Sequence, residues 1–203
     1  MILIGITGGV GSGKSEVLGY VQKEYNAHVL LADEVANKLK EPGMPCFAPV
    51  VECLGKEIIG EDGEIDRVKM ASAIFSDPNK LERINAIIHP EVRRYILQVI
   101  QEKREDGETD FFFLEAALLI EEHYDEIVDE MWYIYADENV RRERLKISRN
   151  YSEEKITSIM SRQMSEQKFR EFCSVVIDNS GDFEETKKQI DEKMGVYLCR
   201  DQK

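Results

Sequence analysis

The sequence predicts an α/β protein built on a five-stranded, doubly wound parallel sheet, and three observations lead to that prediction. Five short apolar segments are expected to form strands, at residues 2–7, 28–33, 111–117, 130–136 and 174–179. Several of these segments are continuous apolar runs, as in parallel strands that are covered on both faces. Helical patterns lie between them, at 14–25, at 91–103 and at 182–198, where Asp182 is the expected N-cap. Strands that alternate with helices are typical of a parallel sheet with right-handed crossovers.

The interval between the second and third expected strands is too long for a single crossover helix. Residues 38–108 contain several prolines and glycines, the turn "EDGE" at 61–64 and the stretch "FSDP" at 75–78, together with helical patterns. We therefore expect an inserted helical subdomain over 38–108, with the core formed by 1–37 and 109–203. Insertions at the carboxyl ends of strands are where α/β proteins build substrate sites.

Composition excludes several classes of protein. The 203 residues are 42% hydrophobic and carry a net charge of −13, which argues against nonspecific binding to nucleic acid. No apolar segment approaches the roughly 18 residues of a membrane helix, and the N-terminus lacks the basic region of a signal peptide. Four cysteines without a C-x-x-C pair indicate reduced thiols. We expect a cytoplasmic protein that is a monomer and binds neither membrane nor nucleic acid.

The first expected strand runs into a glycine-rich loop. Residues 8–15, "GGVGSGKS", match the pattern G-x-x-x-x-G-K-[ST] at every fixed position. In that pattern backbone N–H groups and the start of the next helix surround phosphates, while Lys14 reaches the β- and γ-phosphates and the Ser15 hydroxyl coordinates Mg²⁺. The expected nucleotide contacts are Gly9, Val10, Gly11, Ser12, Gly13, Lys14, Ser15 and Glu16. The alternative, a loop that only links strand to helix, leaves this density of glycine without a purpose.

Asp33 ends the second expected strand, "LLAD", and would lie at the same edge of the sheet as the loop. A carboxylate there can accept a proton from an attacking hydroxyl or hold Mg²⁺ through water, and the alternative is that it caps the following helix. Residues 141–170 hold nine Lys or Arg and four Glu, which indicates either a solvated helix face or a lid over phosphates. No N-K-x-D pattern for guanine follows a late strand, which favours a small-molecule kinase over a regulatory GTPase.

Several longer segments extend the two motifs along the chain: "GITGGVGSGKS" (5–15), "LLADEVA" (30–36), "DGEIDR" (62–67), "IFSDPNKLERINAIIHPEV" (74–92), "RRERLKISRN" (141–150), "SRQMS" (161–165) and "VIDNSG" (176–181). With these segments the chain resembles the dephospho-coenzyme A kinase family almost from end to end. The resemblance implies a P-loop kinase core like that of nucleoside-monophosphate kinases, a coenzyme-A-binding insertion over 38–108 and a helical lid over 139–170. It also implies transfer of a phosphoryl group from ATP, with Mg²⁺, to the ribose 3′-hydroxyl of dephospho-coenzyme A.

The resemblance also assigns roles to single residues. It implies that Asp33 is the base for the 3′-hydroxyl, that Arg144 is catalytic in the lid with Arg149 as a second arginine, and that Asn179 lies beside the nucleotide. Arg67 and His89 correspond to acceptor-binding positions, with an ion pair and a structural histidine as the respective alternatives. Glu16 stands where the family usually has Thr. The alternative function is another small kinase of this fold, acting on a nucleoside monophosphate or a small alcohol.

Overall fold

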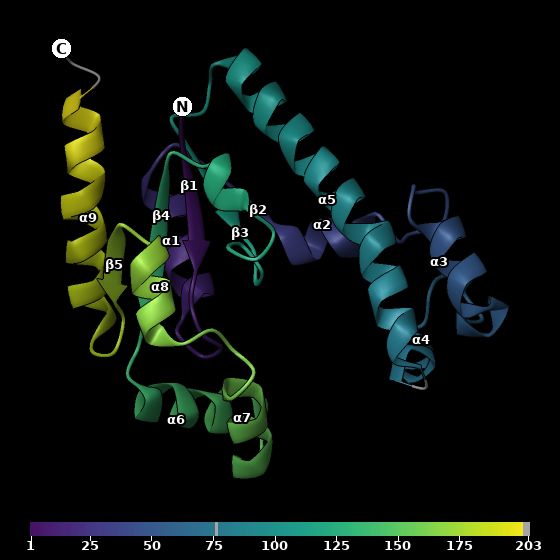
Figure 1. Cartoon of the computed structure of the whole chain (residues 1–203). Helices are drawn as coiled ribbons and strands as arrows, with labels where there is room; N and C mark the ends of the chain where they lie inside the picture. The colour runs from purple at the N-terminus through teal and green to yellow at the C-terminus, as the bar shows by residue number, and fades with distance from the viewer. Residues whose placement is uncertain (76, 201–203) are drawn as a thin grey trace. The chain divides into compact units, whose positions relative to one another are not determined.

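The computed structural model describes residues 1–75 and 77–200, and it divides into two compact units (Figure 1). One unit comprises Met1–Val29 and Gly107–Lys203, and the other comprises Leu30–Asp106. Ser76, within the "FSDP" stretch of the sequence, lies outside the described residues. The two units are described separately below.

The first unit is built on a five-stranded sheet with the order β2-β3-β1-β4-β5. The strands are β1 (Ile2–Thr7), β2 (Ala27–Leu31), β3 (Phe111–Glu115), β4 (Glu130–Tyr135) and β5 (Val175–Asp178). β1 pairs in parallel with both β3 and β4, and β4 pairs in parallel with β5. The predicted fold class and all five predicted strands are confirmed, with ends that differ by up to two residues.

Large apolar side chains of the central strands form the core of this unit. Ile4, Phe113 and Trp132 are fully buried, and the rings of Phe113 and Trp132 meet edge to face at 5.6 Å between centroids. Central strands covered on both faces bury nearly every side chain, which explains why their sequences do not alternate between apolar and polar residues. Each such side chain contributes about 1.5–3 kcal/mol on burial, so these strands form a rigid base for the loops at their ends.

The helices of the first unit are α1 (Lys14–Glu24), α6 (Glu138–Arg149), α7 (Glu153–Met160), α8 (Glu166–Phe172) and α9 (Phe183–Arg200), with a short 3₁₀ turn at Tyr124–Glu126. α8 packs on β4, where the Phe169 ring stacks on the Tyr133 ring at 4.8 Å. α9 packs on β5 and on α1. α6 and α7 lie beyond the end of the sheet at which the loop between β1 and α1 turns (Figure 1).

The second unit is helical. It contains α2 (Ala32–Lys38), α3 (Phe47–Leu54), a 3₁₀ turn (Lys56–Ile58), α4 (Arg67–Phe75) and the 29-residue α5 (Pro78–Asp106). Leu39, Val50, Ile58 and Ile96 are buried, so this unit has an apolar core of its own. In the same unit, Ile59 and Ile65 form an isolated antiparallel β-bridge on either side of the predicted turn at 61–64.

The predicted position of Asp33 at the end of a strand is wrong. β2 ends at Leu31, and Asp33 is the second residue of α2. The helix starts early because "ADEVANK" combines helix formers with acidic residues in the first turn, which the helix dipole favours. The capping alternative is wrong as well, because Leu31 occupies the N-cap position of α2.

Across the described ranges, 1–75 and 77–200, no helix has both the length and the apolar composition needed to cross a membrane.

Candidate active site

The loop between β1 and α1 is a compact turn whose last residue starts the helix. Gly13 is the N-cap of α1 with φ of 89°, a backbone conformation that L side chains rarely adopt. Its carbonyl oxygen accepts hydrogen bonds from the N–H groups of Glu16 and Val17. A Cβ atom on Gly13 would also overlap the Asn179 side-chain amide. Glycine is required here by both backbone conformation and space.

Lys14 folds back over the first residue of the loop. Its ammonium donates a hydrogen bond to the Gly8 carbonyl oxygen at 2.8 Å and lies 3.6 Å from a carboxylate oxygen of Glu115. The Lys14 and Glu115 side chains are only 18% and 16% exposed. β1 and β3 are parallel neighbours, so Glu115, the last residue of β3, reaches the same end of the sheet as the loop. The lysine therefore lies across the opening of the loop, between its first residue and a neighbouring carboxylate.

The middle of the loop is held by two side chains from the distant C-terminal half of the chain. The Ser12 carbonyl oxygen accepts hydrogen bonds from the Asn179 amide at 2.9 Å and from the Arg144 guanidinium at 3.3 Å. Asn179 directly follows β5 and is fully buried. Its side-chain amide oxygen accepts a hydrogen bond from the Thr186 hydroxyl at 2.9 Å. Burying an amide side chain costs little free energy only when the amide is hydrogen-bonded. Both the nitrogen and the oxygen of the Asn179 side chain are hydrogen-bonded.

One face of α6 is turned toward the loop. Arg141, Arg144 and Leu145 are spaced as one helix face, and they lie over Gly9, Ser12 and Gly11 respectively. The Arg141 guanidinium is so close to Gly9 that a Cβ atom on this glycine would overlap it. On the same segment, the Val10 N–H donates to the Gln163 side-chain oxygen at 3.1 Å.

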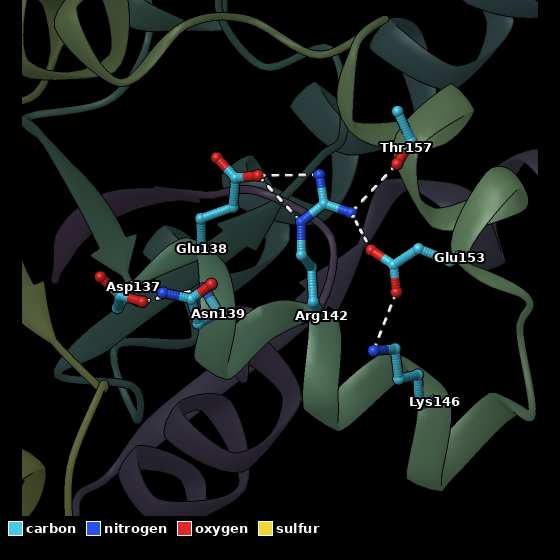
Figure 2. A network of polar contacts seen from close by, with 7 residues as sticks. All are labelled: Asp137, Glu138, Asn139, Arg142, Lys146, Glu153 and Thr157. Carbon is cyan, nitrogen blue, oxygen red and sulfur yellow. Dashed lines mark hydrogen bonds and ion pairs between the residues drawn. The ribbon is translucent and has the colours of Figure 1, made fainter.

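Another face of α6 is fixed to α7 by a polar network (Figure 2). Arg142 contacts Glu138 on its own helix and both Glu153 and Thr157 of α7, and Lys146 pairs with Glu153 at 2.8 Å. The Asp137 side chain caps α6 by accepting from the Asn139 N–H at 2.8 Å. The two neighbouring arginines of α6 thus have different partners, because Arg142 holds α7 and Arg141 lies on the loop.

The surroundings of the loop fit a polyanion. Three cationic groups, Lys14, Arg141 and Arg144, converge on it from α1 and α6. Within residues 1–75 and 77–200, the buried Ser12 hydroxyl and the buried Nε of Arg141 have no hydrogen-bond partner. Buried polar atoms without partners are rare in proteins, and these two belong to side chains at the loop, where phosphate oxygens could accept hydrogen bonds. The loop is therefore suited to the phosphates of a nucleotide.

The second unit contains a small pocket of its own, about 110 Å³ in volume. Lys40 and Arg67 line it, together with Glu41 and Glu64. Burial is the main cause that lowers the pKa of Lys40, and the charge of Arg67 lowers it further, while Asp33 acts in the opposite direction. Asp33, Lys40 and Arg67 are therefore close enough to interact electrostatically. Two cations and two carboxylates line this pocket, so its formal charges balance.

The structure gathers some of the predicted residues and separates others. Lys14, Arg144 and Asn179 meet around the loop, and Ser15 and Glu16 are exposed in the first turn of α1. Arg149 is the last residue of α6, and its guanidinium lies 6.0 Å from the centre of the Tyr151 ring, where it lowers the pKa of that phenol. His89 is half-buried within α5 of the second unit.

Three residues around the loop are missing from the sequence-based prediction. Arg141 precedes Arg144 by three residues, a spacing that places both on one helix face. Glu115 is the first charged residue after the apolar run "FFFL", at the carboxyl end of a predicted strand. Both signals were present in the sequence. Gln163 lies in "SRQMS", and the sequence does not indicate that its side chain accepts from the loop.

Comparison with known proteins gives a consistent result. The family model described as dephospho-CoA kinase matches residues 2–185. The dephospho-CoA kinase of Carboxydothermus hydrogenoformans is 37% identical over 188 residues, which are 93% of this chain and 90% of that protein. The crystal structure of TT1252 from Thermus thermophilus superimposes with a TM-score of 0.80 at 28% identity, covering 96% of both chains. A dephospho-CoA kinase from Campylobacter jejuni has the same fold, with a TM-score of 0.72 at 16% identity and 95% of both chains covered.

Proposed function

The chain belongs to the dephospho-CoA kinase family, and on that basis we propose that it transfers the γ-phosphoryl group of ATP to the ribose 3′-hydroxyl of dephospho-coenzyme A. The products are coenzyme A and ADP. The observation that carries the proposal is the glycine-rich loop surrounded by Lys14, Arg141 and Arg144, in a chain whose match to the family extends over residues 2–185.

The first unit would bind the donor. The proposed phosphate contacts are the backbone of Gly9–Gly13 and the first turn of α1, with Lys14 on the β- and γ-phosphates and Arg144 on the transferred charge. The hydroxyl of Ser15, exposed at the start of α1, would hold Mg²⁺, and bound Mg²⁺ would neutralise charge on the phosphate oxygens. Arg149 and Asn179 are proposed to act at the nucleotide, Asn179 through the Ser12 carbonyl oxygen that it holds.

The second unit would bind the acceptor. Asp33 is the proposed base, which takes the proton of the 3′-hydroxyl as its oxygen forms the bond to the γ-phosphorus. Arg67 is a proposed acceptor contact, and its guanidinium can bind an anionic part of dephospho-coenzyme A through two parallel hydrogen bonds. His89 is proposed as a further acceptor contact. Under the same proposal, residues 38–108 form the acceptor domain and residues 139–170 form the lid.

We also propose that the enzyme acts as a monomer in the cytoplasm, where its donor ATP is supplied. Its proposed partners are then small molecules, and its activity requires neither a membrane nor a nucleic acid.

The direct test is an assay of ADP release by the purified protein with Mg-ATP and a series of acceptors. We expect release that depends on dephospho-coenzyme A and that is lost with Lys14→Met, because the lysine bridges the phosphates between which the bond breaks. Equal release with nucleoside monophosphates or a small alcohol would instead support the alternative kinase function. The identity of the product is checked by mass spectrometry, which distinguishes a phosphorylated acceptor from simple hydrolysis of ATP.

A further inference from the structure

We propose that Arg141 is a catalytic residue that contacts the γ-phosphoryl group during transfer, and that it makes the site discriminate between ATP and ADP. The inference rests on the proposed function only in taking ATP as the donor. It adds a second arginine of the same helix face at the reacting group, beside Arg144, whose guanidinium also donates to the Ser12 carbonyl oxygen.

The first argument is the state of the Arg141 side chain. It leaves the first turn of α6, and its guanidinium lies over Gly9, closer than any side-chain atom at that glycine would permit. Its Nε is buried, and in the described part of the chain this atom finds no hydrogen-bond partner. Arg144 donates to the Ser12 carbonyl oxygen and Arg142 is paired with Glu138 and Glu153. Arg141 therefore differs from both neighbouring arginines in presenting a buried, unsatisfied donor at the loop.

The second argument is the place of Gly9 along a bound triphosphate. The lysine of this loop motif contacts the β- and γ-phosphates, and here Lys14 reaches the carbonyl oxygen of Gly8 at 2.8 Å. The backbone N–H groups of the motif cradle the α- and β-phosphates, so the γ-phosphate lies toward the lysine ammonium. Gly8 and Gly9 therefore lie at the γ-phosphate end. The Arg141 guanidinium, directly over Gly9, is at that end too.

The third argument is the chemistry of the transfer. The bond from the acceptor oxygen to the γ-phosphorus forms while the bond from that phosphorus to the β,γ-bridging oxygen breaks. The electron pair of the broken bond stays on ADP, and the hydroxyl proton passes to the base. Charge is spread over the three equatorial γ-oxygens and the bridging oxygen, and a planar guanidinium is well suited to bind two of these at once. An arginine in this position stabilises the transition state more than it stabilises bound ADP.

The test measures ATP and ADP binding by calorimetry without acceptor, and turnover with acceptor, for Arg141→Gln and Arg141→Lys. For Arg141→Gln we expect ATP to bind about 10-fold more weakly, ADP affinity to change less than about 2-fold, and kcat to fall by about 10³-fold or more. Arg141→Lys keeps the positive charge but loses the planar group that can bind two oxygens at once. Its ATP affinity and kcat should lie between those of Arg141→Gln and those of the unchanged protein. Lys188→Gln is the matched control, because it removes one exposed positive charge from α9 of the same unit, outside residues 139–170, and should change none of these quantities.

Two results would overturn the proposal. Equal weakening of ATP and ADP would show that Arg141 only shapes the loop, and unchanged ATP affinity and kcat would show that it does not touch the phosphates. If Arg141→Gln does not fold, the same comparison is made with Arg141→Lys, for which an unchanged ratio of ATP to ADP affinity contradicts the proposal. The binding measurements need no acceptor, so a loss of ATP over ADP preference supports the role of Arg141 even if dephospho-coenzyme A is not phosphorylated.

Discussion

The side-chain amide of Asn179 donates a hydrogen bond to the carbonyl oxygen of Ser12 across 2.9 Å, joining the end of the last strand to the loop after the first strand. The two residues are separated by 167 positions in the sequence. Asn179 is fully buried, and the Thr186 hydroxyl of α9 fixes its amide orientation. The conformation of the phosphate-binding loop thus depends on residues from the last quarter of the chain.

Asn179→Ala should therefore lower both stability and nucleotide affinity. The change leaves the Thr186 hydroxyl without this acceptor and removes one of two donors to the Ser12 carbonyl oxygen, which costs about 1–3 kcal/mol of unfolding free energy. Urea denaturation measures the stability, and calorimetry measures ATP binding. Gln22→Ala, at an exposed position of α1 outside the proposed lid, is the control and should change neither quantity. Unchanged ATP affinity in Asn179→Ala would contradict the role given to this contact.

Asp33→Asn should separate binding of the donor from transfer. The amide cannot accept the proton of the 3′-hydroxyl, so we expect turnover to fall by about 10²-fold or more while ATP affinity stays the same. Rapid-quench measurement of coenzyme A formation gives the transfer rate, and calorimetry gives ATP affinity. Glu34→Gln alters the next carboxylate of α2, which is also exposed, and should leave the rate unchanged. Normal turnover in Asp33→Asn would remove this residue from the reaction.

Arg142→Gln should loosen α7 without disturbing the rest of the first unit. Arg142 contacts Glu138 on its own helix and joins α6 to α7 at Glu153 and Thr157 (Figure 2). We expect faster amide hydrogen exchange over Glu153–Met160 and unchanged exchange in the central strands, as measured by mass spectrometry. Arg170→Gln removes an ion pair within α8 and a cation–π contact with Tyr135 of β4, neither of which involves α7, so it should leave the exchange of α7 unchanged. Unaltered exchange of α7 in Arg142→Gln would show that burial of its Ile156 side chain suffices to hold this helix.

The thiol of Cys173 should resist alkylation in alkaline solution. Burial raises its pKa from 9.0 to about 12, so the folded protein keeps the thiol protonated at pH 9, where an unfolded chain ionises half of its thiols. Because the folded-state pKa is the higher one, the resulting stabilisation is complete below pH 9 and is lost as the pH rises toward 12. Iodoacetamide at pH 9 should modify the exposed Cys199 first, and Cys173 only after urea is added. Equal rates for both in native protein would contradict the burial of Cys173.

The elements that the sequence predicted well are those with a strong local signal. The continuous apolar runs around Phe112 and Ile134 specify buried parallel strands wherever the rest of the chain lies. The loop motif likewise fixes Lys14 and Gly13 at the start of a helix. The sequence misplaces Asp33 because α2 begins directly after β2, and nothing in "LLAD" marks the boundary between Leu31 and Ala32.

Side-chain contacts between distant segments were beyond the reach of the sequence. Nothing local to "SRQMS" shows that Gln163 accepts from the Val10 N–H, since 153 residues separate the two. The difference between Arg141 and Arg142 also depends on the tertiary structure, because it is set by which face of α6 meets the loop and which meets α7. The sequence therefore predicts which residues are charged at the site but not which partner each one takes.

The two hydrogen bonds to the Ser12 carbonyl oxygen fix more than that oxygen. A trans peptide unit is planar, and its C=O and N–H point in opposite directions. When Asn179 and Arg144 hold the carbonyl of Ser12 on one side, they direct the N–H of Gly13 to the other side. The aim of one main-chain donor, at the residue that begins α1, is thereby set by two side chains that come from the end of β5 and from α6.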